Sequence, residues 1–531
     1  MTNIKDIITL CKNGQIDEAL KKASDEYEIT PNDVWVQRAM GWALYYQVRS
    51  DLEHGQSEQL LNHAELLLSL SLLTPEQDAM IIDNLLWKLA EFLKSSPKDN
   101  MALADCVFDI IHTHCFRPSK AYSFLLKCFL AFKGWDKMQA CLEWWNLDNL
   151  MPEDYASFRL DNGRTLMSLA EQAYIAYAKV LLLSHDREQI RAFIPKIEAL
   201  ADQYPDMTYP GYFCGKLLLA DGANRDEALK RVMPFVYKKM SEFWVWQLLS
   251  EIYKDEPDTQ LACLIRATVC NTQETFLGKV RMRLAKLYIA RGEYGHARYQ
   301  IDKVATCYQQ QGWHIPHELE DLMRWPEVKE ACPRGKPSVP FQRLTNAILK
   351  SGAQEHIAIV THVNIKVGGV HVVYGLHKHL MLKDKYLDGP VSEGTLLRLY
   401  LYEKRGGTAR IVSVERADVL DIHNPETSSY IKELKGTVNR KNDASFAFIN
   451  QGSISCYISP VLVEKYKLKH GSQADFIAAL VYNKKKSVEL ECSNSTRGNG
   501  KYAHGALTVE RRVDVRRTLS CDRNQCEISQ I

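Results

Sequence analysis

The stretch SFAFINQGSISCYIS (445–459) alternates large aromatic side chains with small and aliphatic ones. Phe446 and Phe448 lie two residues apart, and Tyr457 follows after a polar segment that contains a glycine. Alternation with a period of two, interrupted by a turn signal, is typical of two short β-strands. The stretch therefore predicts a strand pair in a β-rich part of the chain.

The two faces of the first strand allow two arrangements. Side chains alternate across a strand, so Phe446 and Phe448 share one face while Ala447 and Ile449 share the other. If Ala447 and Ile449 line a core, the rings face solvent and form a binding surface. If the rings line the core, the strands are an ordinary half-buried pair. We expect the first arrangement, and the sequence leaves the second open.

The surrounding residues extend this pattern over 432–492. Five strand-like runs follow one another, with a longer insert of residues 460–473 between the third and the fourth. The runs are KGTVNRK, SFAFIN, ISCYIS, ADFIAALVYN and SVELEC. Five short strands at this spacing predict a small closed barrel of the OB type.

This block resembles the cold-shock domains. Gly436, Thr437 and Val438 stand where the first strand of that family opens, and residues 444–449 and 456–459 stand where its two nucleic-acid-binding motifs lie. The resemblance implies that Phe446, Phe448 and Tyr457 stack on the bases of single-stranded RNA or DNA.

The block departs from the family in three places. Arg440 and Lys441 replace the aromatic pair of the first strand, Ala444 replaces the usual lysine, and Ser459 replaces a histidine. The resemblance therefore implies a smaller stacking platform, with positive charge in place of part of it.

Basic residues near the strand pair are candidate phosphate contacts. They are Arg440, Lys441, Lys484, Lys485 and Lys486. Cationic side chains beside stacking rings are typical of sites for single-stranded nucleic acid. The alternative is that they form an ordinary solvated face.

The segment 356–430 is also strand-like and is predicted to be a diverged OB-like domain. VNIK (363–366) repeats the character of VNRK (438–441). His371 and Tyr374 are candidate nucleotide contacts within it. Alternating histidines on a strand are more often a polar face than metal ligands, so we predict no metal site. The tail 493–531, rich in glycine, serine and arginine, is predicted to be a basic flexible arm or a solvated end.

Residues 1–330 differ in composition and periodicity. All ten tryptophans lie in this part, and apolar residues recur at intervals of three and four, which predicts helices. The segment 331–355 opens with ACPRGKPSVP, and its three prolines predict a linker.

Part of the helical region repeats itself. Gly215, Ser250 and Ala285 are spaced by 35 residues, and Trp246 and Tyr253 flank the second of these small residues. The pattern resembles the tetratricopeptide repeat, a helix–turn–helix unit of about 34 residues. The resemblance implies an α-solenoid whose groove docks a protein partner. The predicted fold is thus multidomain α + β: a solenoid of helical hairpins followed by one or two OB-like barrels.

The bulk composition narrows the function classes. A net charge of +2 does not by itself indicate nucleic acid, so that prediction depends on a local surface. No apolar run reaches the length of a membrane span, and the start of the chain lacks a signal-peptide pattern, so we expect a cytoplasmic protein without a membrane partner. The fourteen cysteines, scattered and without CxxC pairs, are expected to be free thiols.

Sequence signatures of catalysis are absent. No phosphate loop, dinucleotide fingerprint, zinc-protease motif or nucleophile elbow occurs. We therefore predict a non-catalytic adaptor without cofactors, which binds single-stranded nucleic acid, RNA rather than DNA, and docks a protein partner. The alternatives are a purely protein-binding scaffold, or an accessory subunit of a multi-protein system, such as one for phage defence.

Overall fold

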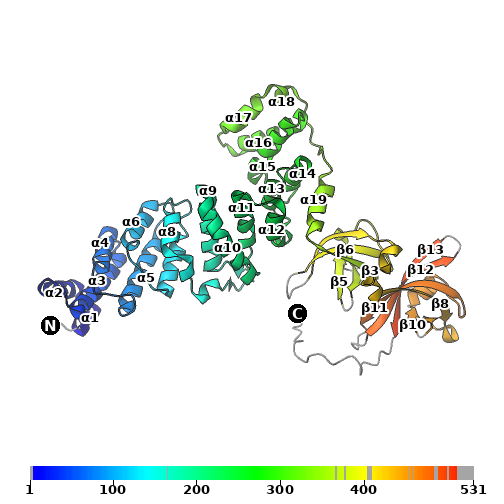
Figure 1. Ribbon diagram of the computed structural model, residues 1–531, viewed down its shortest axis with the longest axis horizontal. Helices are drawn as coiled ribbons and strands as arrows, with labels where there is room; N and C mark the ends of the chain where they lie inside the picture. The colour runs from blue at the N-terminus through cyan, green and yellow to red at the C-terminus, as the bar shows by residue number, and fades with distance from the viewer. Residues whose placement is uncertain are drawn as a thin grey trace. The chain divides into compact units, whose positions relative to one another are not determined.

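The computed structural model describes residues 4–163, 165–364, 367–375, 378–403, 409–452, 454–458, 460–482, 488–498 and 501–510 (Figure 1). The chain divides into two compact units, Met1–Lys238 and Lys239–Ile531. The domain boundaries proposed from the sequence remain predictions. Within the described residues, every helix is too short or too polar to cross a bilayer.

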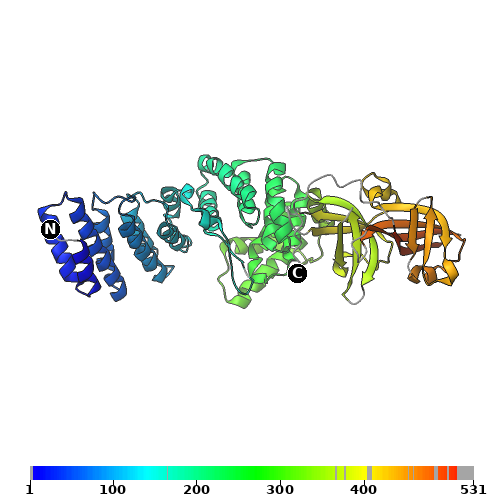
Figure 2. The ribbon, with the colours of Figure 1, turned by 90° about the horizontal axis from the view of Figure 1, so that it is seen from below.

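The first unit is a stack of antiparallel helical hairpins, which Figure 2 shows from below. One hydrophobic cluster extends through it from Ile7 to Leu218. Its helices are α1 (Ile4–Lys12), α2 (Ile16–Ile29), α3 (Val34–His54), α4 (Ser57–Leu68), α5 (Ala79–Ser95), α6 (Met101–Ile111), α7 (Lys120–Phe129), α8 (Met138–Trp145), α9 (Leu169–Ser184), α10 (Arg187–Gln203), α11 (Pro210–Asp221) and α12 (Arg225–Lys239).

Small residues mark the positions where neighbouring helices approach closely. A Cβ atom on Gly41 would lie 3.1 Å from Cδ1 of Leu73, and one on Gly215 only 2.0 Å from Cγ2 of Val232. These contacts explain why the sequence keeps glycine on α3 and α11. The helical hairpins agree with the predicted repeats, whereas their relation to the tetratricopeptide family stays a prediction.

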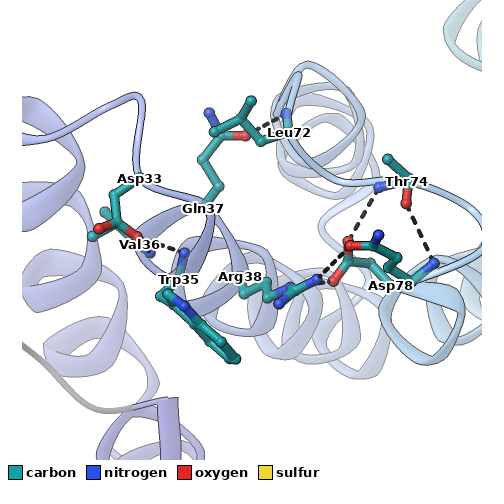
Figure 3. A network of polar contacts seen from close by, with 9 residues as sticks. Asp33, Trp35, Val36, Gln37, Arg38, Leu72, Thr74 and Asp78 are labelled. Carbon is teal, nitrogen blue, oxygen red and sulfur yellow. Dashed lines mark hydrogen bonds and ion pairs between the residues drawn. The ribbon is translucent and has the colours of Figure 1, made fainter.

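A network of polar contacts joins the start of α3 to the turn before α5 (Figure 3). The Asp33 carboxylate caps α3 by accepting a hydrogen bond from the backbone amide of Trp35 at 2.7 Å. Arg38 Nε donates to Asp78 at 2.6 Å, and the backbone amide of Thr74 donates to the same carboxylate at 3.1 Å. Asp78 is buried and thus holds the two segments together.

We expect Asp78→Asn to lower the free energy of unfolding by about 2 kcal/mol, because a buried charge-assisted hydrogen bond is lost and Arg38 keeps its charge. Urea unfolding followed by circular dichroism measures the change. Glu76→Gln, which alters an exposed carboxylate two residues away, is the control and should be neutral. Equal effects of the two substitutions would contradict this role for Asp78.

A long connection interrupts the succession of hairpins between α8 and α9. It contains two 3-10 turns, η1 (Leu147–Asn149) and η2 (Pro152–Tyr155), and a small hairpin of β1 (Phe158–Arg159) and β2 (Thr165–Leu166). Tyr155 stacks on Tyr204, the C-cap residue of α10, with ring centroids 4.9 Å apart, which fixes the connection to the helices.

The second unit begins with further helices. Trp246 is fully buried, and Arg281, also buried, pairs with Glu274 at 2.7 Å and hydrogen-bonds Gln300 at 2.7 Å. The elements are α13 (Phe243–Ile252), α14 (Pro257–Thr268), η3 (Glu274–Phe276), α15 (Gly278–Ala290), α16 (Tyr294–Gln311), α17 (His317–Arg324), α18 (Pro326–Glu330) and α19 (Phe341–Ser351).

The proline-rich segment after α18 packs on the helices before it. The backbone amide of Arg334 donates to the Gly295 carbonyl at 2.8 Å, and a Cβ atom on Gly335 would lie 2.9 Å from the Tyr299 ring. Helix α19 follows and meets the strands through an ion pair of Lys350 with Glu415.

The first β region is an antiparallel sheet with strand order β5-β4-β3-β6-β7. Its members are β3 (Gln354–Asn364), β4 (Gly369–Gly375), β5 (Lys378–Lys383), β6 (Leu396–Tyr402) and β7 (Arg410–Arg416), with the 3-10 turns η4 (Asp384–Tyr386), η5 (Val419–His423) and η6 (Thr427–Ser429). The described strands form a five-stranded sheet. The diverged OB-like domain that the sequence predicted over 356–430 stays a prediction.

The second β region is a closed barrel with strand order β10-β13-β12-β11-β8-β9. Its members are β8 (Ile431–Asn439), η7 (Lys441–Asp443), β9 (Ala447–Gln451), β10 (Ile454–Ile458), α20 (Pro460–Lys465), β11 (Gln473–Tyr482), β12 (Val488–Gly498) and β13 (Lys501–Glu510). Residues 493–498 and 501–510, which the sequence placed in the tail 493–531, lie in β12 and β13, where Gly498 pairs with Lys501.

The barrel and the open sheet share a core. Ile431 and Ile477, on the outer face of the barrel, pack in one cluster with Ile359 of the sheet. The Tyr430 hydroxyl donates to the Ile357 carbonyl at 2.7 Å, and both groups are buried. The sheet thus covers one end of the outer face of β8 and β11 and leaves the other end uncovered.

One cysteine departs from the expectation of free thiols. Cys456 on β10 is fully buried and forms a disulfide bond, so that expectation is wrong at this position. Ten other cysteines, all before residue 333, are free thiols.

Candidate nucleic-acid interface

The alternation of β9 and β10 decides which side chains face outward. Ala447 and Ile449 of β9 are fully buried in the barrel core, as are Cys456 and Ile458 of β10. Phe448 lies between the two buried residues of β9 and is only partly covered. Small and aliphatic residues of β9 and β10 therefore face the barrel core, which also holds Phe476 of β11, and the rings of Phe446, Phe448 and Tyr457 stand on the outer surface.

Three rings meet on that surface. Phe448 and Tyr457 are directly opposite each other on β9 and β10, and Phe446 precedes β9. The ring centroids are 5.9 Å apart for Phe446–Phe448, 5.6 Å for Phe446–Tyr457 and 5.8 Å for Phe448–Tyr457. Phe446 is 40% exposed and the other two are half-buried. We call Phe446, Phe448 and Tyr457 the aromatic platform.

The Tyr457 hydroxyl adds a hydrogen-bonding group to this platform. Partial burial raises the pKa of the Tyr457 phenol above its ordinary value. The phenol therefore remains protonated at neutral pH and can donate a hydrogen bond to an acceptor on a ligand.

A row of polar side chains runs beside the aromatic platform. On β9 and β10 it lies two residues from the platform ring of each strand, on the same face as the rings. The register aligns Gln473, Thr437, Asn450 and Ser455 across β11, β8, β9 and β10. Gln473 Nε2 donates to Thr437 Oγ1 at 2.9 Å, and Ser455 Oγ donates to Asn450 Oδ1 at 2.8 Å. We call these four residues the polar row. Only the cross-strand register brings these residues together, so the row was not predicted from the sequence.

Arg440 stabilises the loop that borders the platform. Its Nε donates to the Ala444 carbonyl at 2.7 Å, and its Nη1 donates to the Leu468 carbonyl at 3.2 Å. The guanidinium thus connects the segment before β9 with the segment before β11. We assign Arg440 a positioning role in addition to the phosphate contact predicted from the sequence.

The same bonds bring further basic side chains to the end of β8, beside the predicted Lys441. The backbone amide of Arg440 donates to Nδ1 of His470 at 3.2 Å, next to Asn439, which pairs with Phe448. Exposed lysines lie around this point: Lys441, Lys467 and Lys469. The run KYKLKH at 465–470 is visible in the sequence, but its proximity to the rings follows only from the fold.

Other predicted site residues lie elsewhere. Lys484, Lys485 and Lys486 fall outside the described residues. Tyr374 is only 7% exposed, with its ring edge-on to His356 at 5.5 Å, so it offers no open face for stacking.

His371 remains partly exposed on β4, where it pairs with His362 on β3. Burial, together with the neighbouring His362 and His379, lowers the pKa of His371, so it is mostly neutral at pH 7. In the part of the chain that the structure describes, histidines, cysteines and carboxylates nowhere gather as a metal-binding group.

Two family models match parts of the chain. Residues 432–488 match the S1/CSD-like domain 2 of the TOTE conflict systems, and residues 208–346 match a domain of unknown function, DUF7017. Together the matches cover less than half of the chain, and no curated protein matches it. The first match coincides with the closed barrel up to the start of β12. The chain therefore carries an S1/CSD-like domain that follows a helical region, and this supports a nucleic-acid-binding or accessory role.

Proposed function

We propose that this protein is a non-catalytic adaptor whose barrel binds single-stranded nucleic acid and whose helical region docks a protein partner. The observation that carries the proposal is the aromatic platform on the outside of a closed S1/CSD-like barrel. Stacking supplies about 1–3 kcal/mol per base and accepts any base, because every base has a π face. A single strand, unlike a duplex, exposes those faces.

The surroundings of the platform support a polynucleotide ligand. Exposed cations, among them Lys441 and Lys469, lie at one end of β8 and suit a phosphate backbone. The polar row presents amide and hydroxyl groups that suit base edges and the ribose 2′-hydroxyl, which favours RNA over DNA. The match to a domain of conflict systems favours an accessory role in a multi-protein system whose catalysis lies in another chain.

Fluorescence anisotropy with labelled 12-nucleotide RNA, DNA and duplex RNA tests the proposal on the full chain. We expect micromolar or tighter binding of the single strands, weaker binding of the duplex, and affinity that falls as salt rises. Absence of salt-sensitive binding at micromolar protein would reject the nucleic-acid half of the proposal. It would then favour the alternative of a purely protein-binding scaffold.

The polar row yields a separate prediction about base selectivity. We expect Asn450→Ala with Ser455→Ala to weaken the preferred homopolymer by about fivefold, since one or two hydrogen bonds of about 1 kcal/mol each are lost. The affinities for the other three homopolymers should change less, so the four affinities should become more similar. Titration with four homopolymers measures this spread, with the exposed-site variant Ser429→Ala as control. A uniform loss for all four homopolymers would contradict a role in reading bases.

A further inference from the structure

A groove with a volume of about 660 Å³ opens on the first unit. Trp87 of α5 and Phe124 of α7 lie on one side, and Phe158, Leu166 and Met167 of the connection between α8 and α9 lie on the other. The volume is within the range of about 300–1,000 Å³ that is usual for binding pockets. Surface connections held on a rigid scaffold often carry binding residues.

Several of the side chains that line the groove are large, apolar and exposed to solvent. Phe158 is 66% exposed, Met167 44%, Leu166 41% and Trp87 36%. The ring centroids of Trp87 and Phe124 lie 5.0 Å apart, so the two rings form a continuous apolar wall. Single exposed apolar residues are common on protein surfaces, but a cluster around one groove indicates an interaction surface.

Hydrogen bonds hold the two walls in place. The Asp154 carboxylate accepts from the Ser123 hydroxyl at 2.6 Å and from the backbone amide of Met151 at 2.9 Å, which ties η2 to α7. The Ser168 hydroxyl caps α9 by accepting from the backbone amide of Glu171 at 3.1 Å. The groove is therefore formed before any ligand arrives, which reduces the entropic cost of binding.

The charges around the groove differ between its walls. Lys120 and Lys127 line the α7 side, and the Lys94 ammonium lies 5.8 Å from the Phe124 ring centroid. Among the described residues, none of these three lysines has a carboxylate within ion-pair distance. Glu153 and Asp154 line the opposite side. Carboxylates on that side disfavour a phosphate backbone, whereas unpaired lysines favour acidic side chains of a peptide.

We propose that this groove binds a short segment of a partner protein. The segment inserts two or more large apolar side chains between Trp87 and Phe158 and places carboxylates against the lysines Lys94, Lys120 and Lys127. This inference rests on the adaptor function proposed above and names the chemistry of its protein partner. Methionine at Met167 suits such a site, since its flexible side chain adapts to differently shaped apolar groups.

Selection of a displayed random dodecapeptide library on the full chain provides the probe. We expect enriched peptides to combine large apolar residues with aspartate or glutamate. Phe158→Ser should weaken a selected peptide by about 30-fold, the usual result of removing a central apolar anchor. Lys120→Glu with Lys127→Glu should weaken it by about tenfold or more through charge reversal, and these exposed substitutions leave the fold intact.

Matched controls lie elsewhere on the same unit. Leu183→Ser removes an apolar side chain that is 78% exposed on α9, and Lys22→Glu reverses an exposed charge on α2. Both variants should bind the selected peptide as the unaltered chain does. Three results would overturn the proposal: no enrichment, peptide binding that ignores the groove substitutions, or groove variants that lose oligonucleotide rather than peptide.

These experiments can reject either the nucleic-acid proposal or the docking-groove proposal without rejecting the other. Replacement of the three platform rings by alanine should leave peptide binding unchanged, and the groove variants should leave oligonucleotide binding unchanged. If oligonucleotide binding is absent while the peptide still depends on Phe158 and Lys120, the nucleic-acid half is wrong and the docking groove stands.

Discussion

Replacing Phe446, Phe448 and Tyr457 together by alanine should reduce the affinity for single-stranded RNA by at least about 100-fold. Each stacked base contributes about 1–3 kcal/mol, and a loss of ~2.7 kcal/mol already corresponds to that factor. The three rings touch one another with centroids no more than 5.9 Å apart, so their removal deletes one shared surface. Anisotropy with a labelled 12-nucleotide RNA at fixed salt measures the effect.

The controls for this substitution separate stacking from folding. Phe276→Ala removes a phenylalanine that is 61% exposed on η3, outside the barrel, and should leave affinity unchanged. Tyr457→Phe keeps the ring and should cost less than about threefold, because only one hydroxyl group is lost. The triple variant should retain its thermal transition, since Ala447 and Ile449 still fill the core. Unchanged RNA affinity in the folded triple variant would show that the platform does not bind RNA.

The sequence was sufficient to predict which side chains of β9 face the barrel core and which face outward. One face of the stretch 446–449 holds Phe446 and Phe448 and the other holds Ala447 and Ile449, and a small barrel needs interior residues that fit together closely. The second set is fully buried in the structure. A local period of two thus sufficed to orient the rings, because it involves only neighbouring residues of one strand.

Two features of the site could not be predicted from the sequence, for one physical reason: the polar row, and the proximity of the lysines at 465–470 to the aromatic platform. Gln473 lies far from Thr437 along the chain, and only the register of β8 with β11 brings them together. The loop before β11 meets the end of β8 because Arg440 donates to the Leu468 carbonyl. Register and loop packing are tertiary properties, so neither pattern nor composition determines them.

Short elements were also missed because they carry too little periodicity. The hairpin of β1 and β2 has two residues in each strand, which is fewer than any alternation can reveal. At 493–498, the serine- and asparagine-containing composition concealed the extension of β12.

Gly436→Val should destabilise the barrel and abolish RNA binding together. A Cβ atom on Gly436 would lie 2.2 Å from the Asn450 carbonyl oxygen and 3.0 Å from Ile449 Cγ1. The first contact is with backbone, which cannot rotate away as a side chain does, so β8 must separate from β9. We expect the free energy of unfolding of the second unit to fall by at least about 3 kcal/mol, the upper part of the range for overpacked sites.

This substitution also tests whether the platform depends on the barrel that carries it. Phe448 precedes Ile449 on the displaced strand, so its ring moves away from Asn439 on β8, its cross-strand partner. Gly278→Ala is the control, since a Cβ atom there meets nothing closer than 3.8 Å. Thermal unfolding and RNA anisotropy are measured on the same samples. Gly436→Val should lose both the thermal transition and the RNA binding, whereas the triple alanine variant should lose only the RNA binding. If Gly436→Val leaves both the unfolding transition and the RNA affinity unaltered, the close approach of β8 to β9 is not required for barrel stability. The position of the platform would then not depend on that approach.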